Sequence, residues 1–412
     1  EPVVLVLGRT NENLAENRLR EPGGVASDQV DLQVQAVALA PQIRSARDEL
    51  ESVRQLPAAL VQSLDQAGLM QLYLPRSMGG PEVDPISSYH VIEEISKVDG
   101  SVGWCTFLSS VGCYFSGWLK AEVGRELYGN NPHVRIAASF RALGEAQAVD
   151  GGYQVTGQWD YASGIDHANW LAVSCRVMDK EGLRLTPSGD PVNRMFMVSA
   201  EHATIYDTWN PMGMFGTGSK DFKVDGIFVP EERTWGLGDP AQESSPLYDP
   251  RLLLTMTWTL VVANALGMSR GAMEAFVELA NQSGSTRSTT LLRDRAPIQN
   301  TVGKAEAIIN ASRTYVLDSV GAVMDAVTDG KKDPGPEIAQ ARLAITHGMW
   351  EAVKAVDMLF HAAGTNAIHQ KYPLERFFRD IHVSVQHGAG LLSNFDSGGQ
   401  AMLGIKPSDP GW

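Results

Sequence analysis

Cysteine is scarce in this chain of 412 residues. Cys105, Cys113 and Cys175 are the three cysteines, and none of them belongs to a C-x-x-C pair. An odd number of isolated cysteines argues against a disulfide framework and against a structural zinc site. We therefore expect a fold without cross-links, in keeping with a reducing cytoplasm, and we predict no metal site.

Basic residues are outnumbered and long apolar runs are missing. The chain has 34 Lys and Arg against 48 Asp and Glu, which gives a net charge of -14. A surplus of negative charge disfavours sequence-independent binding to nucleic acid or to anionic lipid. No apolar run approaches the ~18 residues that cross a bilayer. We therefore predict no nucleic-acid partner and no membrane association.

The apolar periodicity divides the chain into regions. It is helical from residue 28 to 134, with Ile86, Tyr89 and Ile92 on one face, and alternating from 135 to 234, where Gly151 and Gly152 separate two strand-like runs. Two long helical stripes follow, over 302–327 and 338–359. We predict a lead-in (1–27), an N-terminal helical domain (28–134), a central β domain (135–234) and a C-terminal helical bundle (235–412).

Four strings of residues in this order resemble the acyl-CoA dehydrogenase superfamily. They are LPAALVQSLDQAGL at 56–69, GQWDYASG at 157–164, WNPMGMFGTGS at 209–219 and YPLERFFRDIH at 372–382. The resemblance covers residues 28 to 395. It implies an α+β, acyl-CoA dehydrogenase-like fold with an N-terminal helical domain, a central β-barrel or sandwich, a C-terminal four-helix bundle and a flavin held between them.

The resemblance also implies which residues hold FMN or FAD. Ser163 matches the hydroxyl residue that bonds the N5 region of the flavin ring, and a hydroxyl can both donate and accept there. One of Arg287, Arg293 and Arg295 matches the segment that reaches the flavin phosphate of a neighbouring subunit in a homotetramer, and we choose Arg287. The expected cofactor-binding set is Tyr161, Ser163, Met214, Thr217, Ser219 and Arg287.

No nicotinamide site is expected, because the glycines at 213–218 read G-x-x-G-x-G and lack a βαβ context. Electrons must then arrive on a flavin or leave to another protein. Arg379 and Asp380, in the fourth string, are interpreted as a structural ion pair that fixes a loop.

One position separates two activities of this fold. Acyl-CoA dehydrogenases commonly carry a carboxylate shortly after the Arg-Asp string to remove the α-proton of the thioester. The matching position here is Gly388, and the next acid is Asp396. His387 stands beside it and resembles the histidine of flavin-dependent monooxygenases, in which imidazole acts as a base or as a hydrogen-bond partner.

The function implied is that of the oxygenase component of a two-component aromatic hydroxylase. A separate NAD(P)H:flavin reductase would supply reduced, exchangeable flavin, O2 would add at flavin C4a, and His387 and Ser163 would be catalytic. Trp104 and Tyr114 are expected to contact a small, aromatic substrate, although Tyr114 replaces the second histidine of close relatives. Three alternatives stay open: an acyl-CoA dehydrogenase with a relocated base, an N- or S-oxygenase of the same fold, and a flavin-binding protein without activity.

Overall fold

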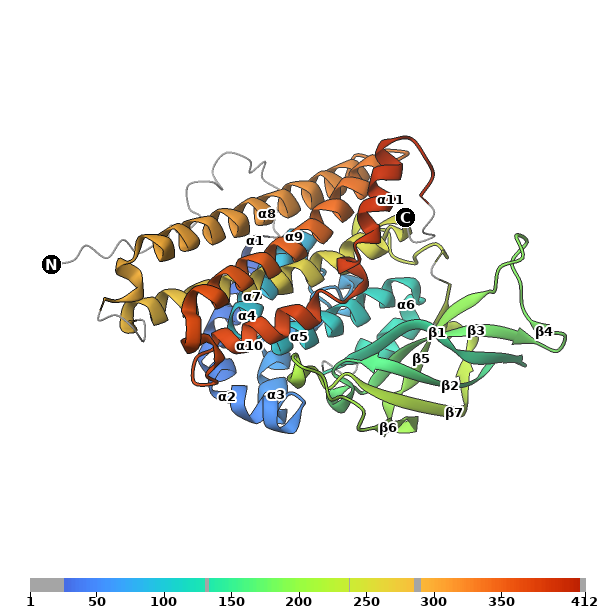
Figure 1. Ribbon diagram of the computed structural model, residues 1–412. Helices are drawn as coiled ribbons and strands as arrows, with labels where there is room; N and C mark the ends of the chain where they lie inside the picture. The colour runs from blue at the N-terminus through green and yellow to red at the C-terminus, as the bar shows by residue number, and fades with distance from the viewer. Residues whose placement is uncertain (1–25, 130–132, 237, 285–289, 408–412) are drawn as a thin grey trace.

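The computed structural model describes residues 26–129, 133–236, 238–284 and 290–407. Within them, helices come first, a sheet follows, and long helices close the chain (Figure 1). This order confirms the predicted α+β fold class. The domain limits at 134 and 234 fall immediately before the first long strand and at the last short one, and they stay a prediction.

The N-terminal region is helical because acidic caps and glycine breaks punctuate its apolar stripes. Asp84 accepts from the backbone N–H groups of Ile86 and Ser87 at the start of α4, and Asp99 caps α5 in the same way. The helices here are α1 (Ala26–Ala38), α2 (Ala40–Val53), α3 (Ala58–Gln66), α4 (Pro85–Val98), α5 (Gly100–Tyr114) and α6 (Ala121–Gly124).

The central region is one mixed sheet with the order β6-β7-β2-β1-β3-β5-β8, and β4 pairs with β3. β1 and β3 run parallel, and the other pairs are antiparallel. Gly151 has φ +74 in the turn between β1 and β2, as the glycine pair predicted. The strands are β1 (Ile136–Val149), β2 (Gly152–Ala162), β3 (Trp170–Asp179), β4 (Gly182–Leu183), β5 (Asn193–Ser199), β6 (Thr204–Tyr206), β7 (Lys220–Pro230) and β8 (Thr234–Trp235).

The C-terminal region is a bundle whose apolar stripes pack as predicted. α8 lies along α9, and α7 lies along both α4 and α9. Residues of the first stripe, such as Ile309 and Val316, are buried on α8, and Ile345 and Val356 are buried on α9. The helices are α7 (Leu253–Gln282), α8 (Ala296–Thr328), α9 (Gly335–Ala363), α10 (Leu374–Ser384) and α11 (Ser393–Met402).

The α7 helix corrects the expectation that no segment is apolar enough to cross a membrane. The segment Pro250–Gln282 has a mean hydropathy of 1.5 over its most apolar window, so it is long and apolar enough by composition. However, 83% of that window is buried inside the fold. A helix that is apolar on every side is expected in the middle of a large bundle, where neighbours surround it.

Helices α5 and α10 connect the bundle to the sheet. α5 contacts both β1 and the short 3-10 helix η8 (Phe215–Thr217) that precedes β7, and α10 contacts α5. Figure 1 shows both helices running toward the sheet from the helical side of the molecule. The residues expected around a flavin come from these elements and from the end of β2.

Candidate active site

The end of β2 turns sharply at Tyr161 and brings Ser163 inward. Tyr161 has φ 57, an uncommon value for a residue with a side chain, and the β2–β7 register shifts between Trp159 and Ala162. The Ser163 N–H donates to the Tyr161 carbonyl over 2.9 Å. As a result the Tyr161 side chain is 64% exposed, whereas Ser163 is 6% exposed.

The loop before β7 supplies three further groups beside Ser163. Met214 has φ 56 and immediately precedes η8. Its carbonyl accepts from the Thr217 hydroxyl over 2.9 Å and from Trp209 Nε1 over 3.1 Å. The Thr217 hydroxyl lies 2.7 Å from that of Ser219, which lies 2.6 Å from Ser163 Oγ. Two strands that are far apart in sequence are thus joined by a chain of three buried hydroxyl groups.

Two half-buried rings complete the group on the helical side. Trp104 on α5 donates from Nε1 to Ser163 Oγ over 3.2 Å. Its ring also meets the His387 ring edge-on, with 5.7 Å between centroids, and the Phe107 ring at 4.9 Å. The structure therefore brings together Ser163, Trp104 and His387, which the sequence predicted separately.

His387 is held in one orientation by its own backbone. It precedes the 3-10 helix η14 (Gly388–Gly390), and its Nδ1 accepts from the Ala389 N–H over 3.1 Å. Burial lowers the pKa of His387 to about 4, and no charged group in the described part of the chain contributes to that shift. The ring is therefore neutral at pH 7, and because Nδ1 is an acceptor, its proton sits on Nε2.

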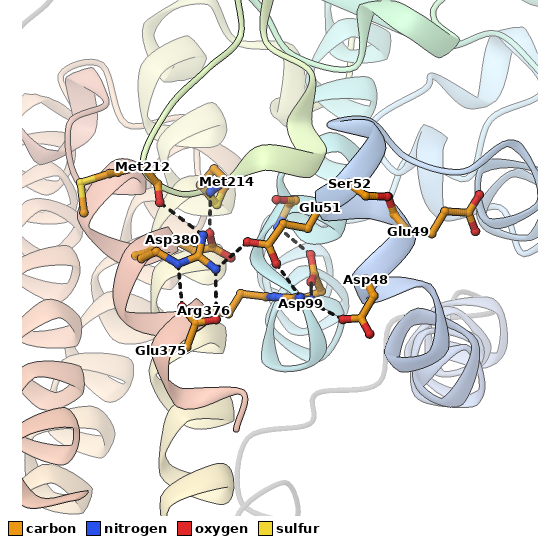
Figure 2. A network of polar contacts seen from close by, with 12 residues as sticks. Asp48, Glu49, Glu51, Ser52, Asp99, Met212, Met214, Glu375, Arg376 and Asp380 are labelled. Atoms are coloured by element: carbon orange, nitrogen blue, oxygen red, sulfur yellow. Dashed lines mark hydrogen bonds and ion pairs between the residues drawn. The ribbon is translucent and has the colours of Figure 1, made fainter. Parts of the chain in front are cut away.

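The loop that carries Met214 is anchored on α10 (Figure 2). The Met214 N–H donates to the Asp380 carboxylate, and Arg379 Nη1 donates to the Met212 carbonyl over 3.3 Å. Between these two, a Cβ on Gly213 would lie 2.5 Å from the Arg379 backbone, so only glycine allows this close approach. Burial, with the nearby Asp99 carboxylate, raises the pKa of Asp380 to about 7.

The expected ion pair between Arg379 and Asp380 is not what the structure shows. Arg379 pairs instead with Glu375 at 2.7 Å and with Glu51 at 2.5 Å, whereas Asp380 holds the Met214 backbone. The two side chains of adjacent residues on a helix point about 100° apart, which allows them separate partners. Sequence reasoning missed this anchor because its two residues are 166 positions apart.

Tyr114, which was predicted to contact the substrate, is not part of this group. Tyr114 is fully buried, its hydroxyl donates to the Leu247 carbonyl over 2.9 Å, and its ring stacks on Tyr248 at 5.5 Å. Its polar group is therefore already satisfied inside the core. Arg287 lies outside the described residues. Arg293, weighed against it, donates to Asn281 over 3.1 Å.

The group around Ser163 fits a flavin by the chemistry of its donors. A flat ring with a polar edge requires hydrogen-bonding groups on one side and apolar surface over its faces. The hydroxyl of Ser163 supplies the first. The half-buried ring of Trp104, which donates to Ser163, and the Tyr161 side chain, which is 64% exposed, supply apolar surface next to it.

Comparisons with known proteins agree with this geometry. The family model for the acyl-CoA dehydrogenase N-terminal domain matches residues 29–126, and that for the acyl-CoA dehydrogenase C-terminal domain matches residues 259–390. A flavin-dependent monooxygenase, oxygenase subunit HsaA, of Rhodococcus jostii (strain RHA1) is 28% identical over 363 residues, 85% of this chain and 92% of that protein. An indole-3-acetate monooxygenase of Acinetobacter baumannii is 28% identical over 90% of this chain and 92% of its own.

A solved structure extends the likeness to three dimensions. XiaF from Streptomyces, in complex with FADH2 and glycerol, superposes with a TM-score of 0.86 at 26% identity, over 94% of this chain and 98% of that one. The chain belongs to the acyl-CoA dehydrogenase family, whose fold and whose N- and C-terminal domains it shares. Within that family it is a flavin-dependent monooxygenase, which confirms the resemblance found in the sequence.

Proposed function

We propose that this protein is the oxygenase of a two-component system. A separate NAD(P)H:flavin reductase supplies reduced FMN or FAD, and one atom of O2 is inserted into a small aromatic substrate. When bound, the reduced flavin supplies the two electrons that activate O2. Support comes from the relatives that are named oxygenase subunits, and from a site with a neutral imidazole where a dehydrogenase would need a carboxylate.

His387 carries this proposal. A dehydrogenase base must accept a proton from carbon, which a carboxylate does best when its surroundings raise its pKa to about 6 to 7. An imidazole with a pKa of about 4 is a weak base, and its Nδ1 is already occupied by the Ala389 N–H. What remains is an Nε2–H group that can donate. We therefore assign His387 as a hydrogen-bond donor to the reacting oxygen or to the substrate, and we drop the role of base.

Ser163 and Trp104 position the reactants. Ser163 Oγ lies at the meeting point of β2, the loop before β7 and α5, so it can fix the polar edge of a flavin. Trp104 lies between Ser163 and His387 and also contacts Phe107. Its partly open ring gives an aromatic substrate a surface to pack against, edge or face. Tyr114 has no part in this assignment.

The test is direct oxygenation in the absence of a reductase. The purified protein is mixed with chemically reduced FMN or FAD, an aromatic substrate panel that includes phenols and indole-3-acetate, and ¹⁸O2. We expect one ¹⁸O atom in the product from at least one phenol or indole, with the protein present in catalytic amount. Reduced flavin that is oxidised at the rate seen without protein, with no labelled product, would contradict the proposal.

The same experiment separates the open alternatives. An N- or S-oxygenase would label an amine or a thioether in an extended panel and leave the phenols untouched. A dehydrogenase would bleach bound oxidised flavin on addition of butyryl-CoA without O2. Because no acid accompanies His387 in the described residues, we expect no bleaching.

We also propose a homotetramer that acts in the cytoplasm. Apolar side chains at the C-terminal end of the described chain support self-association, since large exposed apolar patches mark interaction surfaces. They include Leu392, Met402 and Leu403, which are 60%, 73% and 77% exposed. Light scattering coupled to size exclusion should give four times the mass of one chain, and a monomer would contradict the assignment.

A further inference from the structure

The hydroxyl groups of Ser163, Ser219 and Thr217 form a buried chain of hydrogen bonds. Ser163, Ser219 and Thr217 are 6%, 5% and 2% exposed, so water does not reach them freely. Trp104 Nε1–H enters the chain at Ser163, and the Met214 carbonyl ends it at Thr217. Each hydroxyl group has one hydrogen to donate and two lone pairs. The direction of every bond in the chain is therefore tied to that of its neighbours.

Three arrangements of the protons satisfy the two distances between hydroxyl groups. One of them, in which Ser163 and Thr217 both donate to Ser219, leaves the buried Ser219 hydrogen without a partner in the chain and is costly, so two remain. In the inward arrangement, Ser163 donates to Ser219, Ser219 donates to Thr217, and Thr217 donates to the Met214 carbonyl. In the outward arrangement, Thr217 donates to Ser219, Ser219 donates to Ser163, and the Ser163 hydrogen points out of the chain. Trp104 donates to Ser163 in both.

The two arrangements offer a ligand opposite groups at Ser163. In the inward arrangement Ser163 has used its hydrogen and keeps one lone pair, so it can only accept. In the outward arrangement both lone pairs are filled, by Trp104 and Ser219, so it can only donate. The inward arrangement makes one more bond inside the protein, because the Met214 carbonyl accepts the Thr217 hydrogen. A buried hydrogen without a partner is costly, so the protein favours the inward arrangement.

This preference matches one redox state of the cofactor, and the argument rests on the function proposed above. Nitrogen N5 of reduced flavin bears a hydrogen and donates, whereas N5 of oxidised flavin has a bare lone pair and accepts. Groups next to N5 tune which state is bound more tightly. We propose that Thr217 and Ser219 are positioning residues that set Ser163 as an acceptor, so that the site selects reduced flavin over oxidised flavin.

The selection is measured as a ratio of dissociation constants, oxidised over reduced, for FMN and for FAD. Quenching of protein tryptophan fluorescence under anaerobic conditions gives the reduced value, and flavin fluorescence gives the oxidised one. Neither measurement depends on turnover.

The critical variant is Thr217→Val, which keeps the shape of the side chain but can neither accept from Ser219 nor donate to Met214. The Ser219 hydrogen must then turn to Ser163, and Ser163 becomes a donor.

We expect the wild type to bind reduced flavin more tightly, and Thr217→Val to lower the ratio by about 3- to 10-fold, the size of one hydrogen bond between neutral groups. Thr217→Ser keeps the hydroxyl and should stay within about twofold of the wild type. In a two-electron couple a tenfold change in the ratio shifts the midpoint potential of the bound flavin by about 30 mV, which is an independent readout. Ser219→Ala, which frees the Ser163 hydrogen, should shift the ratio in the same direction.

The outcomes distinguish the two proposals. If the wild type binds neither form of flavin, the proposed function fails and the selection fails with it. A second outcome is that flavin binds, and that Thr217→Val and Ser219→Ala are folded by circular dichroism and keep the wild-type ratio of dissociation constants. The proton order then does not select between reduced and oxidised flavin, and only this inference is overturned. An equal loss in Thr217→Ser and Thr217→Val would also overturn it, since that pattern reports side-chain shape.

Discussion

Replacing His387 with asparagine separates the two roles of this side chain. An asparagine at the start of a short helix can accept a backbone N–H through its own side chain, so the bond that Nδ1 makes with Ala389 has a substitute. The donor at Nε2 is lost, because the amide is shorter than the imidazole. His387→Ala loses both the bond with the Ala389 N–H and the donor at Nε2, so it serves as the matched variant without a helix cap.

The size of the effect follows from the donor that is removed. Losing one aligned donor at a reacting oxygen costs about 10²- to 10³-fold in rate in enzymes where this has been measured, and at least tenfold is expected here. The folded protein should be nearly unaffected in His387→Asn. In His387→Ala the free energy of unfolding should fall by about 1 kcal/mol, the usual cost of a lost cap.

The pH dependence provides the sharper test. With a pKa of about 4, only about 0.1% of His387 is protonated at pH 7, so between pH 5.5 and 8 its charge does not change appreciably. Product formed per O2 consumed, with hydrogen peroxide measured in parallel, should be flat over that range in the wild type as far as this residue is concerned. An inflection near pH 6.5 that disappears in His387→Asn would refute the reasoning. A yield of product per O2 in that variant equal to that of the wild type would refute it as well.

Three further predictions follow from the same contacts. Tyr114→Phe should lower the free energy of unfolding by about 1 kcal/mol, through the lost bond to Leu247, and leave the substrate KM unchanged; a raised KM would return Tyr114 to the substrate site. Because burial lowers the pKa of His387, its contribution to stability is present above pH 6.5 and is lost as the pH falls through about 4. Urea titrations over that range should therefore show the wild type losing up to about 3 kcal/mol more than His387→Asn, and parallel losses would contradict the shift. Asp380→Ala leaves the Met214 N–H without its partner and should cost about 1–3 kcal/mol together with flavin affinity, whereas Asp380→Asn, which keeps an acceptor, should lose less; equal losses would mean that the anchor is the charge.

Local patterns were sufficient to predict the elements. The stripes on α8 and α9 are buried as their spacing predicted, and Gly151 lies in the turn between β1 and β2, with Gly152 as the first residue of β2. Caps such as Asp84 and Asp99 act within three residues of their own position. These features depend on neighbours along the chain, so a single sequence carries them. The apolar character of α7 was harder to interpret, because burial within a bundle and burial within a membrane favour the same residues.

The candidate site could be predicted only in part. Ser163, Thr217 and Ser219 were named from strings that resemble a family, and Trp104 and His387 from positions that the same resemblance assigns. The structure brings the five together in one group. Tyr114 was named from its position alone, and the structure places its hydroxyl in the core. The tautomer of His387 depends on the Ala389 N–H, a contact that has no signature in residue types.

What the sequence determined by itself is the order of helices and strands and the presence of an imidazole where a carboxylate would make a dehydrogenase. What only the tertiary structure decided is which groups meet to form the hydrogen bonds of the site. Ser163 and Ser219 are 56 positions apart, Trp104 and Ser163 are 59 apart, and Met214 and Asp380 are 166 apart. A hydrogen bond needs its two atoms within about 3 Å. Periodicity along the chain has no means of recording such a distance, so the partners of these groups follow from the fold alone.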